Sequence, residues 1–224
     1  MSGPRQLPLP LPHEPSFARE DFLAFPSNAA ALALIDAWPR WPAAQMLLSG
    51  PEGSGKSHLA AIFARQTGAT RLDGRSLGDP DAATKGTALV IDDADAGGDE
   101  AALFHLMNFA RSRNVSVLMT ARTPPDLWRV RTPDLLSRLR LAPVVEIAPP
   151  EPELIEAALT KLFADRQLGV EPSLIAYVAR RLERSLGAAR ALVEALDAEA
   201  LAQGRKVTRT MAAALLNSGA AEPD

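Results

Sequence analysis

The sequence predicts an α/β protein with a mostly parallel five-stranded sheet, covered by helices on both faces and followed by a smaller helical region. Five short strand candidates, four of them apolar runs, alternate with helix-favouring segments as far as Pro149, which is typical of a parallel sheet. Beyond Pro149 every segment repeats its apolar residues at helical spacing. The chain has 224 residues, of which 47% are hydrophobic and 23% charged, so it can bury the core that this fold needs.

Composition and charge exclude several classes of protein. The chain has no cysteine, which excludes disulfides and zinc sites built on cysteine. Its formal net charge of −3 argues against a protein that coats nucleic acid through its overall field. Residues 111–140 nevertheless carry seven arginines against Asp126 and Asp134, a local net charge of +5. This excess could face DNA, a nucleotide phosphate or an acidic partner.

The sequence gives no sign of a membrane segment or a signal peptide. No apolar stretch is long enough to span a bilayer. Prolines at positions 4, 8, 10 and 12 interrupt the N-terminus, which therefore lacks the continuous apolar region of a signal peptide. We expect a cytoplasmic protein with no membrane partner.

A P-loop occupies residues 50–57, between the apolar run 46–48 and the helix-favouring segment that begins at His58. The residues of the loop are Gly50, Pro51, Glu52, Gly53, Ser54, Gly55, Lys56 and Ser57. The glycines let successive backbone N–H groups point at phosphate oxygens, and the following helix adds the positive end of its dipole. Lys56 would then reach the β- and γ-phosphates, and the Ser57 hydroxyl would bind Mg²⁺. A glycine turn without a ligand is the alternative.

A second element of a nucleotide site follows in residues 87–93, an apolar run that ends in Asp92 and Asp93. This pattern is typical of a Walker B strand. Asp92 would hold Mg²⁺, commonly through water, and Asp93 would act as the catalytic base that orients an attacking water. An acidic turn after an ordinary strand is the alternative.

The other elements of this region follow the same alternation. Further strands are expected at residues 70–72, 116–120 and 144–147. Helices are expected at 29–37 after an N-cap at Ser27, at 99–113, and in a short segment capped by Thr132 and Pro133. Thr120 ends its strand, where its hydroxyl could sense the γ-phosphate or be satisfied within the protein.

Four regions are predicted along the chain. Residues 16–149 form the α/β nucleotide-binding domain, and residues 150–218 form a helical domain. The helices of the second domain are expected at 153–166, 172–184, 187–202 and 208–217. Residues 1–15 contain too many prolines for a helix and should be extended, and residues 219–224 should be a disordered tail.

The hexapeptide at residues 6–11 has leucines at alternate positions. An extended chain presents alternate side chains to one surface, and prolines lower the entropy lost on docking. The hexapeptide resembles the motif by which bacterial replication proteins bind the β sliding clamp of DNA polymerase III. In that motif Gln6 would lie at the rim of the clamp pocket and Leu9 and Leu11 inside it, with Leu7 on the same face. A disordered tail is the alternative.

Together these segments resemble the DnaA-related AAA+ proteins over nearly the whole chain. Residues 22–28 are similar to the segment that leads into that family's nucleotide pocket, 50–59 to its P-loop, 89–93 to its Walker B strand and 133–139 to the segment with its arginine finger. A clamp motif in front, with no helix-turn-helix DNA-binding domain behind, is similar to small regulatory members of the family. The resemblance implies an AAA+ core with a helical lid.

The resemblance also implies the cofactors and further binding residues. ADP or ATP, with Mg²⁺, would contact the P-loop together with Leu23, His58, Thr120 and a lid arginine. The family's lid arginine aligns with Gly187, so we expect Arg190 or Arg184 to take its place. Because of this departure, the resemblance implies only a weak ATPase activity for the chain itself.

The function implied by the resemblance is inactivation of DnaA. A nucleotide-bound protein tethered to the DNA-loaded clamp would promote ATP hydrolysis by DnaA, and Arg138 would supply an arginine finger in trans. DNA would be met at most indirectly, through the clamp. A homodimer is compatible with the way AAA+ subunits pair. A surface arginine at a helix end is the alternative for Arg138.

Two other functions stay open from the residues themselves. A stand-alone ATPase or small P-loop kinase would need Lys56, Ser57, Asp92 and Asp93, all of which are present, although no substrate-binding insertion is evident. A helicase loader that binds DNA would suit the arginine excess of residues 111–140, but the net acidity disfavours it.

Overall fold

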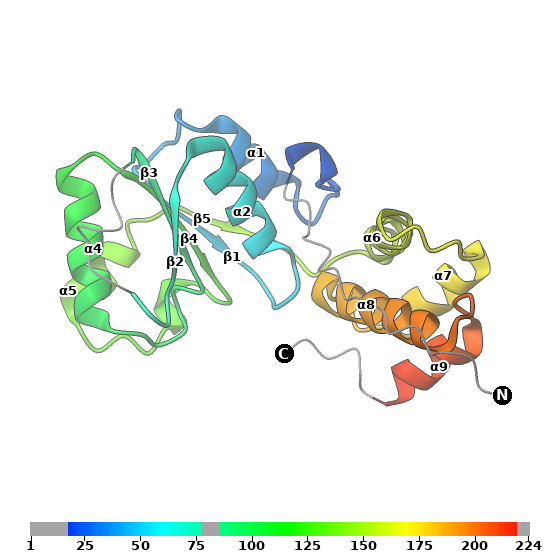
Figure 1. Cartoon of the computed structure of the whole chain (residues 1–224). Helices are drawn as coiled ribbons and strands as arrows, with labels where there is room; N and C mark the ends of the chain where they lie inside the picture. Colours follow the sequence, from blue (N-terminus) through cyan, green and yellow to red (C-terminus); the bar gives the residue numbers. More distant parts are fainter. Residues whose placement is uncertain (1–17, 78–85, 219–224) are drawn as a thin grey trace. The chain divides into compact units, whose positions relative to one another are not determined.

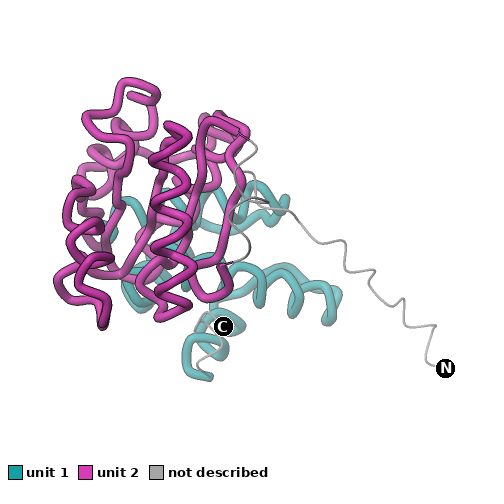
Figure 2. The backbone as a smooth tube through the Cα atoms, turned by 90° about the vertical axis from the view of Figure 1, so that its left-hand side faces the viewer, with its two compact units in different colours: residues 1–16, 150–224 teal, residues 17–149 magenta. Residues whose placement is uncertain are grey.

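The computed structural model describes residues 18–77 and 86–218 (Figure 1). The described chain divides into two compact units, an α/β unit that ends at Pro149 and a helical unit that begins at Pro150 (Figure 2). The hexapeptide at residues 6–11 and the tail at 219–224 lie outside the described residues. None of the helices in the described ranges is long and apolar enough to cross a membrane.

The α/β unit is built on a five-stranded sheet with the order β2-β3-β4-β1-β5, and every pairing is parallel. The strands are β1 (Gln45–Ser49), β2 (Thr70–Asp73), β3 (Ala88–Asp92), β4 (Ser116–Ala121) and β5 (Val144–Glu146). The predicted fold class, a parallel α/β sheet, is therefore confirmed. The register pairs Leu48 with Thr120, which aligns the end of β4 with the strand that enters the P-loop.

Helices cover both faces of this sheet (Figure 1). The helical segments of the unit are η1 (Arg19–Asp21), α1 (Ala29–Ala37), α2 (Lys56–Thr67), α4 (Glu100–Ser112), η2 (Pro125–Leu127) and α5 (Pro133–Leu139). Strand side chains alternate between two apolar clusters, so that Leu47 packs toward α4 and α5 whereas Leu48 packs toward α1 and α2. This period of two explains why the central strands read as continuous apolar runs.

The helical unit consists of α6 (Pro152–Asp165), α7 (Pro172–Ala179), α8 (Leu186–Gln203) and α9 (Arg209–Asn217). Its core gathers one apolar stripe from each helix, with Phe163 and Leu192 fully buried. The guanidinium groups of Arg181 and Arg209 both lie over the ring of Tyr177, at 4.0 and 4.1 Å from its centre, and so connect the end of α7 with the start of α9.

Two local predictions were wrong, and a third was right in position only. Helix α7 ends at Ala179 and not at residue 184, because the hydroxyl of Ser185 accepts a bond from the backbone N–H of Ala188 and caps α8. The N-cap of α1 is Asn28 and not Ser27, and its side-chain amide bonds to the backbone of Phe25 and Leu23. Thr132 is the N-cap of α5 and Pro133 its first residue, as predicted, although the Thr132 hydroxyl donates to Glu100 and does not bond to the helix backbone.

The loops after β2 and β3 are pressed together at two glycines. A Cβ added at Gly98 would lie 2.0 Å from the carbonyl oxygen of Gly74, and one added at Gly74 would lie 2.3 Å from the carbonyl oxygen of Asp93. Neither position has room for a side chain. The contact fixes the backbone directly beside the end of β3.

Candidate nucleotide-binding site

The P-loop connects β1 to α2 and depends on glycine at three places. Gly53 and Gly55 have φ angles of 70° and 99°, in the left-handed region that glycine adopts without strain. Gly50 has no room for a side chain, because a Cβ there would lie 2.4 Å from the carbonyl oxygen of Ile147. The loop therefore curls tightly before Lys56 begins α2.

Lys56 is held inside the loop and is only 6% exposed. Its Nζ donates to the carbonyl oxygens of Gly50 and Pro51, both at 2.8 Å. Burial lowers the pKa of Lys56, and the nearby carboxylates of Asp93 and Asp95 act in the opposite direction. The ammonium group thus lies in the loop where a P-loop holds the β- and γ-phosphates.

Ser54 supplies a test of whether the loop fits a phosphate. Its side chain is 1% exposed, and its Oγ has no hydrogen-bond partner among the described residues. Leaving a buried hydroxyl unsatisfied costs about 1–3 kcal/mol, so such a group is commonly a binding group. A phosphate oxygen in the loop would satisfy it, and the residues present therefore fit a nucleotide.

Asp92, at the end of β3, is the centre of a network that joins four elements of the fold. Its Oδ1 accepts from Thr120 Oγ1 at 2.5 Å and from Ser57 Oγ at 3.2 Å. Its Oδ2 accepts from Arg71 Nη2 at 2.8 Å. The structure thus brings the two predicted Mg²⁺ ligands, Ser57 and Asp92, into direct contact.

The donor set at this point suits Mg²⁺ bound together with a nucleotide. The described residues contain no cluster of three or more His, Asp or Glu side chains that could hold a metal alone. Mg²⁺ prefers oxygen ligands and keeps several waters, so phosphate oxygens and water would complete a site that begins with Ser57 and Asp92.

Asp93 follows β3 in a left-handed conformation, with φ of 52°. Its backbone N–H donates to Thr120 Oγ1 at 2.9 Å, and its Oδ2 accepts from Arg75 Nη2 at 3.0 Å. Burial, and secondly the negative charge of Asp92, raises the pKa of Asp93. A carboxyl group with a raised pKa beside a P-loop is compatible with proton transfer, and the role of Asp93 as a base stays a prediction.

Thr120 is fully buried and connects the two aspartates. Its hydroxyl donates its hydrogen to Asp92 and accepts from the backbone of Asp93. The arrangement matches the expectation of a threonine satisfied within the protein. A direct bond from this hydroxyl to a γ-phosphate would require the bond to Asp92 to break.

The other predicted binding residues lie in three places. Leu23 is half-buried and its carbonyl oxygen accepts from Asn28, while the neighbouring Phe22 packs edge-on against the ring of His58, 5.4 Å away. These contacts bring the segment before α1 against the start of α2. Arg190 is half-buried on α8 and Arg184 is exposed before it, both in the helical unit. Their contact with nucleotide stays a prediction.

Arg138 lies in the last turn of α5, and its guanidinium is 4.8 Å from the centre of the Phe104 ring on α4. The stacking holds a half-buried arginine against a neighbouring helix without an acidic partner in that contact. The two helices thus give Arg138 a defined position.

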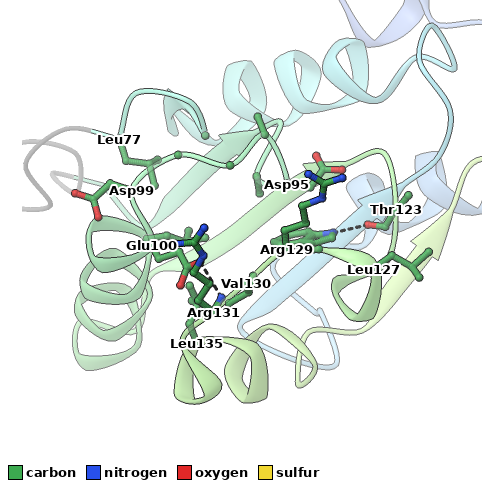
Figure 3. A pocket seen from close by; sticks show the side chains of 17 residues that line it. Leu77, Asp95, Asp99, Glu100, Thr123, Leu127, Arg129, Val130, Arg131 and Leu135 are labelled. Atoms are coloured by element: carbon green, nitrogen blue, oxygen red, sulfur yellow. Dashed lines mark hydrogen bonds between the residues drawn. The ribbon is translucent and has the colours of Figure 1, made fainter.

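A cavity of about 740 Å³ lies beside these helices, between the loops that follow β2, β3 and β4 (Figure 3). Glu100 lies at its edge and accepts from the backbone N–H groups of Arg131 and Thr132, at 2.9 and 3.0 Å. These bonds lower the pKa of Glu100, and the bond from the backbone of Arg131 has the largest effect. Glu100 therefore fixes the segment that leads into α5 and Arg138.

Sequence reasoning missed Arg71 and Arg75, the two cations on the aspartates. Both pairs depend on the parallel register of β2 against β3, in which Asp73 is opposite Asp92. The one signal available was the presence of two arginines four residues apart around the end of a short strand. That signal could not be used without the register.

The sequence of the chain is similar to part of a known protein. No protein-family model matches the chain. Over 83 residues it is 29% identical to the chromosomal replication initiator protein DnaA of Cutibacterium acnes, a match that spans 37% of this chain and 17% of that DnaA. The chain is therefore similar to only a small part of that relative.

Solved structures extend the similarity to the whole fold. Domain III of the Thermotoga maritima replication initiation protein DnaA matches with a TM-score of 0.77 and 19% identity, over 93% of this chain and 98% of that domain. AMPPCP-bound DnaA from Aquifex aeolicus matches with a TM-score of 0.61 and 16% identity, over 76% of this chain and 62% of that one. The chain therefore has a DnaA-like AAA+ fold.

Proposed function

We propose that this chain is a regulator of replication initiation of the kind called Hda. In this proposal it binds ADP or ATP with Mg²⁺ and is held on the β sliding clamp by Gln6, Leu7, Leu9 and Leu11. It then stimulates ATP hydrolysis by DnaA through Arg138. DNA is met only through the clamp.

The observation that carries the nucleotide part is the contact of Ser57 with Asp92 at the mouth of a loop that holds Lys56. A relative with the same fold, DnaA of Aquifex aeolicus, was solved with AMPPCP. The unpartnered Oγ of Ser54 supports the same ligand.

Replacement of Lys56 tests the nucleotide part. Lys56→Ala should weaken binding of a fluorescent, non-hydrolysable ATP analogue by at least about a hundredfold, because a charge-assisted bond to each of the β- and γ-phosphates is lost. Lys206→Ala, which removes an exposed lysine of the helical unit, is the charge-matched control. Unchanged affinity in Lys56→Ala would refute a nucleotide site in this loop.

Arg138 carries the regulatory part. An arginine that enters another subunit's site must be accessible yet held in place, and Arg138 is half-buried on Phe104 at a helix end. A guanidinium beside a γ-phosphate neutralises charge that develops in the transition state.

Arg138→Ala should leave binding of nucleotide and of the clamp unchanged but reduce stimulation of DnaA hydrolysis by at least about a hundredfold, since a finger supplied in trans contributes orders of magnitude in rate. Arg113→Ala is the matched control, because Arg113 also stacks on a phenylalanine of α4, Phe109, at 4.9 Å. Equal loss in both variants would assign the effect to the fold of α4 and not to a finger.

Attachment to the clamp is tested by direct binding. Wild type should bind the isolated β sliding clamp, and a variant with Gln6, Leu9 and Leu11 changed to alanine should not. Pro4→Ala, outside the hexapeptide, is the control and should bind as wild type does. If wild type itself does not bind, the proposed attachment is wrong.

A stand-alone ATPase is the second candidate, because Lys56, Ser57, Asp92 and Asp93 lie together at one edge of the sheet. It predicts ATP turnover by the isolated chain that is abolished in Asp93→Asn. A helicase loader instead predicts tight DNA binding by the isolated chain at physiological salt, where a regulator should bind DNA only weakly and with steep salt dependence.

A further inference from the structure

Arg71 lies on β2, the edge strand next to β3. Its Nη2 is 2.8 Å from Asp92 Oδ2, and the two side chains are 39% and 18% exposed. The pair is therefore only partly shielded from water, and its strength should be that of a half-exposed ion pair. It joins the edge strand to the residue proposed to hold Mg²⁺.

The two oxygens of Asp92 are used differently. Oδ1 accepts from two hydroxyls, those of Thr120 and Ser57, which belong to the site itself. Oδ2 is the oxygen left to accept from water bound to Mg²⁺, and Arg71 occupies it. The guanidinium already balances the charge of this oxygen, and a hydrated divalent cation that bound here as well would be repelled by it.

The second aspartate has a partner of the same kind. Arg75 Nη2 is 3.0 Å from Asp93 Oδ2, with side chains 59% and 31% exposed. Two arginines from the end of β2 thus balance the two negative charges at the end of β3. The charge that would otherwise attract a divalent cation is neutralised within the chain.

We propose that Arg71 competes with Mg²⁺ for Asp92, so that the chain binds nucleotide with little dependence on Mg²⁺. The inference rests on the proposed nucleotide site and adds to it the way in which the metal is controlled. When Mg²⁺ is absent, Arg71 neutralises Asp92 and reduces its repulsion of the phosphates. When Mg²⁺ is present, the ion must displace Arg71 before its water can bond to Asp92.

This competition predicts opposite effects of one substitution. Without Arg71, nucleotide binding in a chelator should weaken, because Asp92 is left as an unbalanced charge near the phosphates. Binding with Mg²⁺ should tighten, because the metal no longer displaces a cation. Each change should be about threefold, the size expected for one half-exposed ion pair.

The experiment measures the affinity for a fluorescent ADP analogue with Mg²⁺ and with a chelator, and compares the two values as a ratio. Arg71→Ala should raise this ratio by about tenfold over wild type, the product of the two opposite changes. Arg71→Gln provides a second variant that keeps the length of a polar side chain. Arg65→Ala, in the exposed last turn of α2, removes the same charge away from Asp92 and should leave the ratio as in wild type.

Asp92→Asn identifies the partner, since Arg71→Ala made in that background should no longer change the ratio. The inference is wrong if folded Arg71→Ala and Arg71→Gln both keep the wild-type ratio while wild type binds nucleotide. If wild type binds no nucleotide under either condition, the proposed function fails and the inference fails with it. The two failures are therefore distinguished by wild type alone.

Discussion

The α/β unit and the helical unit are both packed around apolar side chains, but they differ in where they bury polar ones. Among the described residues, six polar or charged residues are buried over the whole residue, five of them in the α/β unit and one in the helical unit. Those of the α/β unit are Asn28, Ser49, Ser54, Lys56 and Thr120. Three of them, Ser54, Lys56 and Thr120, lie in the P-loop or beside Asp92 and Asp93.

The helical unit uses its buried polar group for structure. Ser185 caps α8, which satisfies one backbone N–H at a helix start. Arg166, whose side chain is 7% exposed, is paired with Glu194 at 2.9 Å. A buried polar group costs free energy unless it is paired, so an accumulation of such groups at one edge of a sheet indicates a site kept for binding and not for stability.

The largest expected effect is a loss of stability when either apolar core is disrupted, and it should be of similar size in the two units. Phe63→Ala in the α/β unit and Phe163→Ala in the helical unit should each lower the free energy of unfolding by about 3–5 kcal/mol, because both rings are fully buried. Chemical denaturation measures the loss. A much smaller loss in Phe163→Ala would mean that the helical unit is packed more loosely than its burial indicates.

Thr120→Val should come next, at about 2–3 kcal/mol of unfolding free energy. The substitution keeps the shape but leaves the Asp92 carboxylate and the Asp93 N–H without their shared partner. Thr160→Val is the control in the helical unit, where the hydroxyl bonds to Glu156 on an exposed face, and it should stay within about 0.5 kcal/mol of wild type. Similar losses at both positions would remove the distinction between the two units.

Ser185→Ala should cost about 1 kcal/mol of unfolding free energy, the usual contribution of an N-cap. Thermal unfolding, followed by circular dichroism, measures the loss. Nucleotide affinity should not change, and a change there would show that the buried serine of the helical unit also acts in binding.

The smallest effect should depend on pH. The pKa of Glu100 is lowered in the folded chain, so its carboxylate stabilises the fold above its unfolded pKa and that contribution is lost as pH falls through the folded pKa. Glu100→Gln should therefore be less stable than wild type at neutral pH, and the two should converge in acid. Glu156→Gln, at an exposed position of α6, controls for the lost charge. A gap that persists in acid would assign the effect to packing instead.

The sequence was sufficient for the elements whose signal is local. Segments of strand length predicted all five strands to within two residues at each end, and the P-loop spacing predicted the start of α2 to within two residues. The order of the motifs along the chain was the only indication of how the strands are placed beside one another. The hydroxyl of Ser57 and Oδ1 of Asp92 are nevertheless 3.2 Å apart, as the motifs predict.

What the sequence could not supply were contacts that depend on two elements at once. Residues 180–184 favour a helix by composition. They are not helical because Ser185 caps the start of α8, which requires a non-helical backbone at that residue. Arg71 looked like an exposed residue on a short strand, and only the pairing of β2 with β3 brings it to Asp92. Arg138 likewise required α4 and α5 together before its stacking on Phe104 could be known.

The contact between Gly74 and Gly98 affects how mutational data on this protein should be interpreted. Neither residue has a functional group, yet a side chain at Gly74 would push the backbone of Asp93, and one at Gly98 would push Gly74 itself. In a screen for loss of function, both positions should score as strongly as Asp92, although they bind nothing. Second-site substitutions that shorten or loosen the loops would rescue variants at Gly74 and Gly98, but they would not rescue the loss of the Asp92 carboxylate. Such rescue therefore distinguishes residues that keep the backbone in place from residues that bind a ligand.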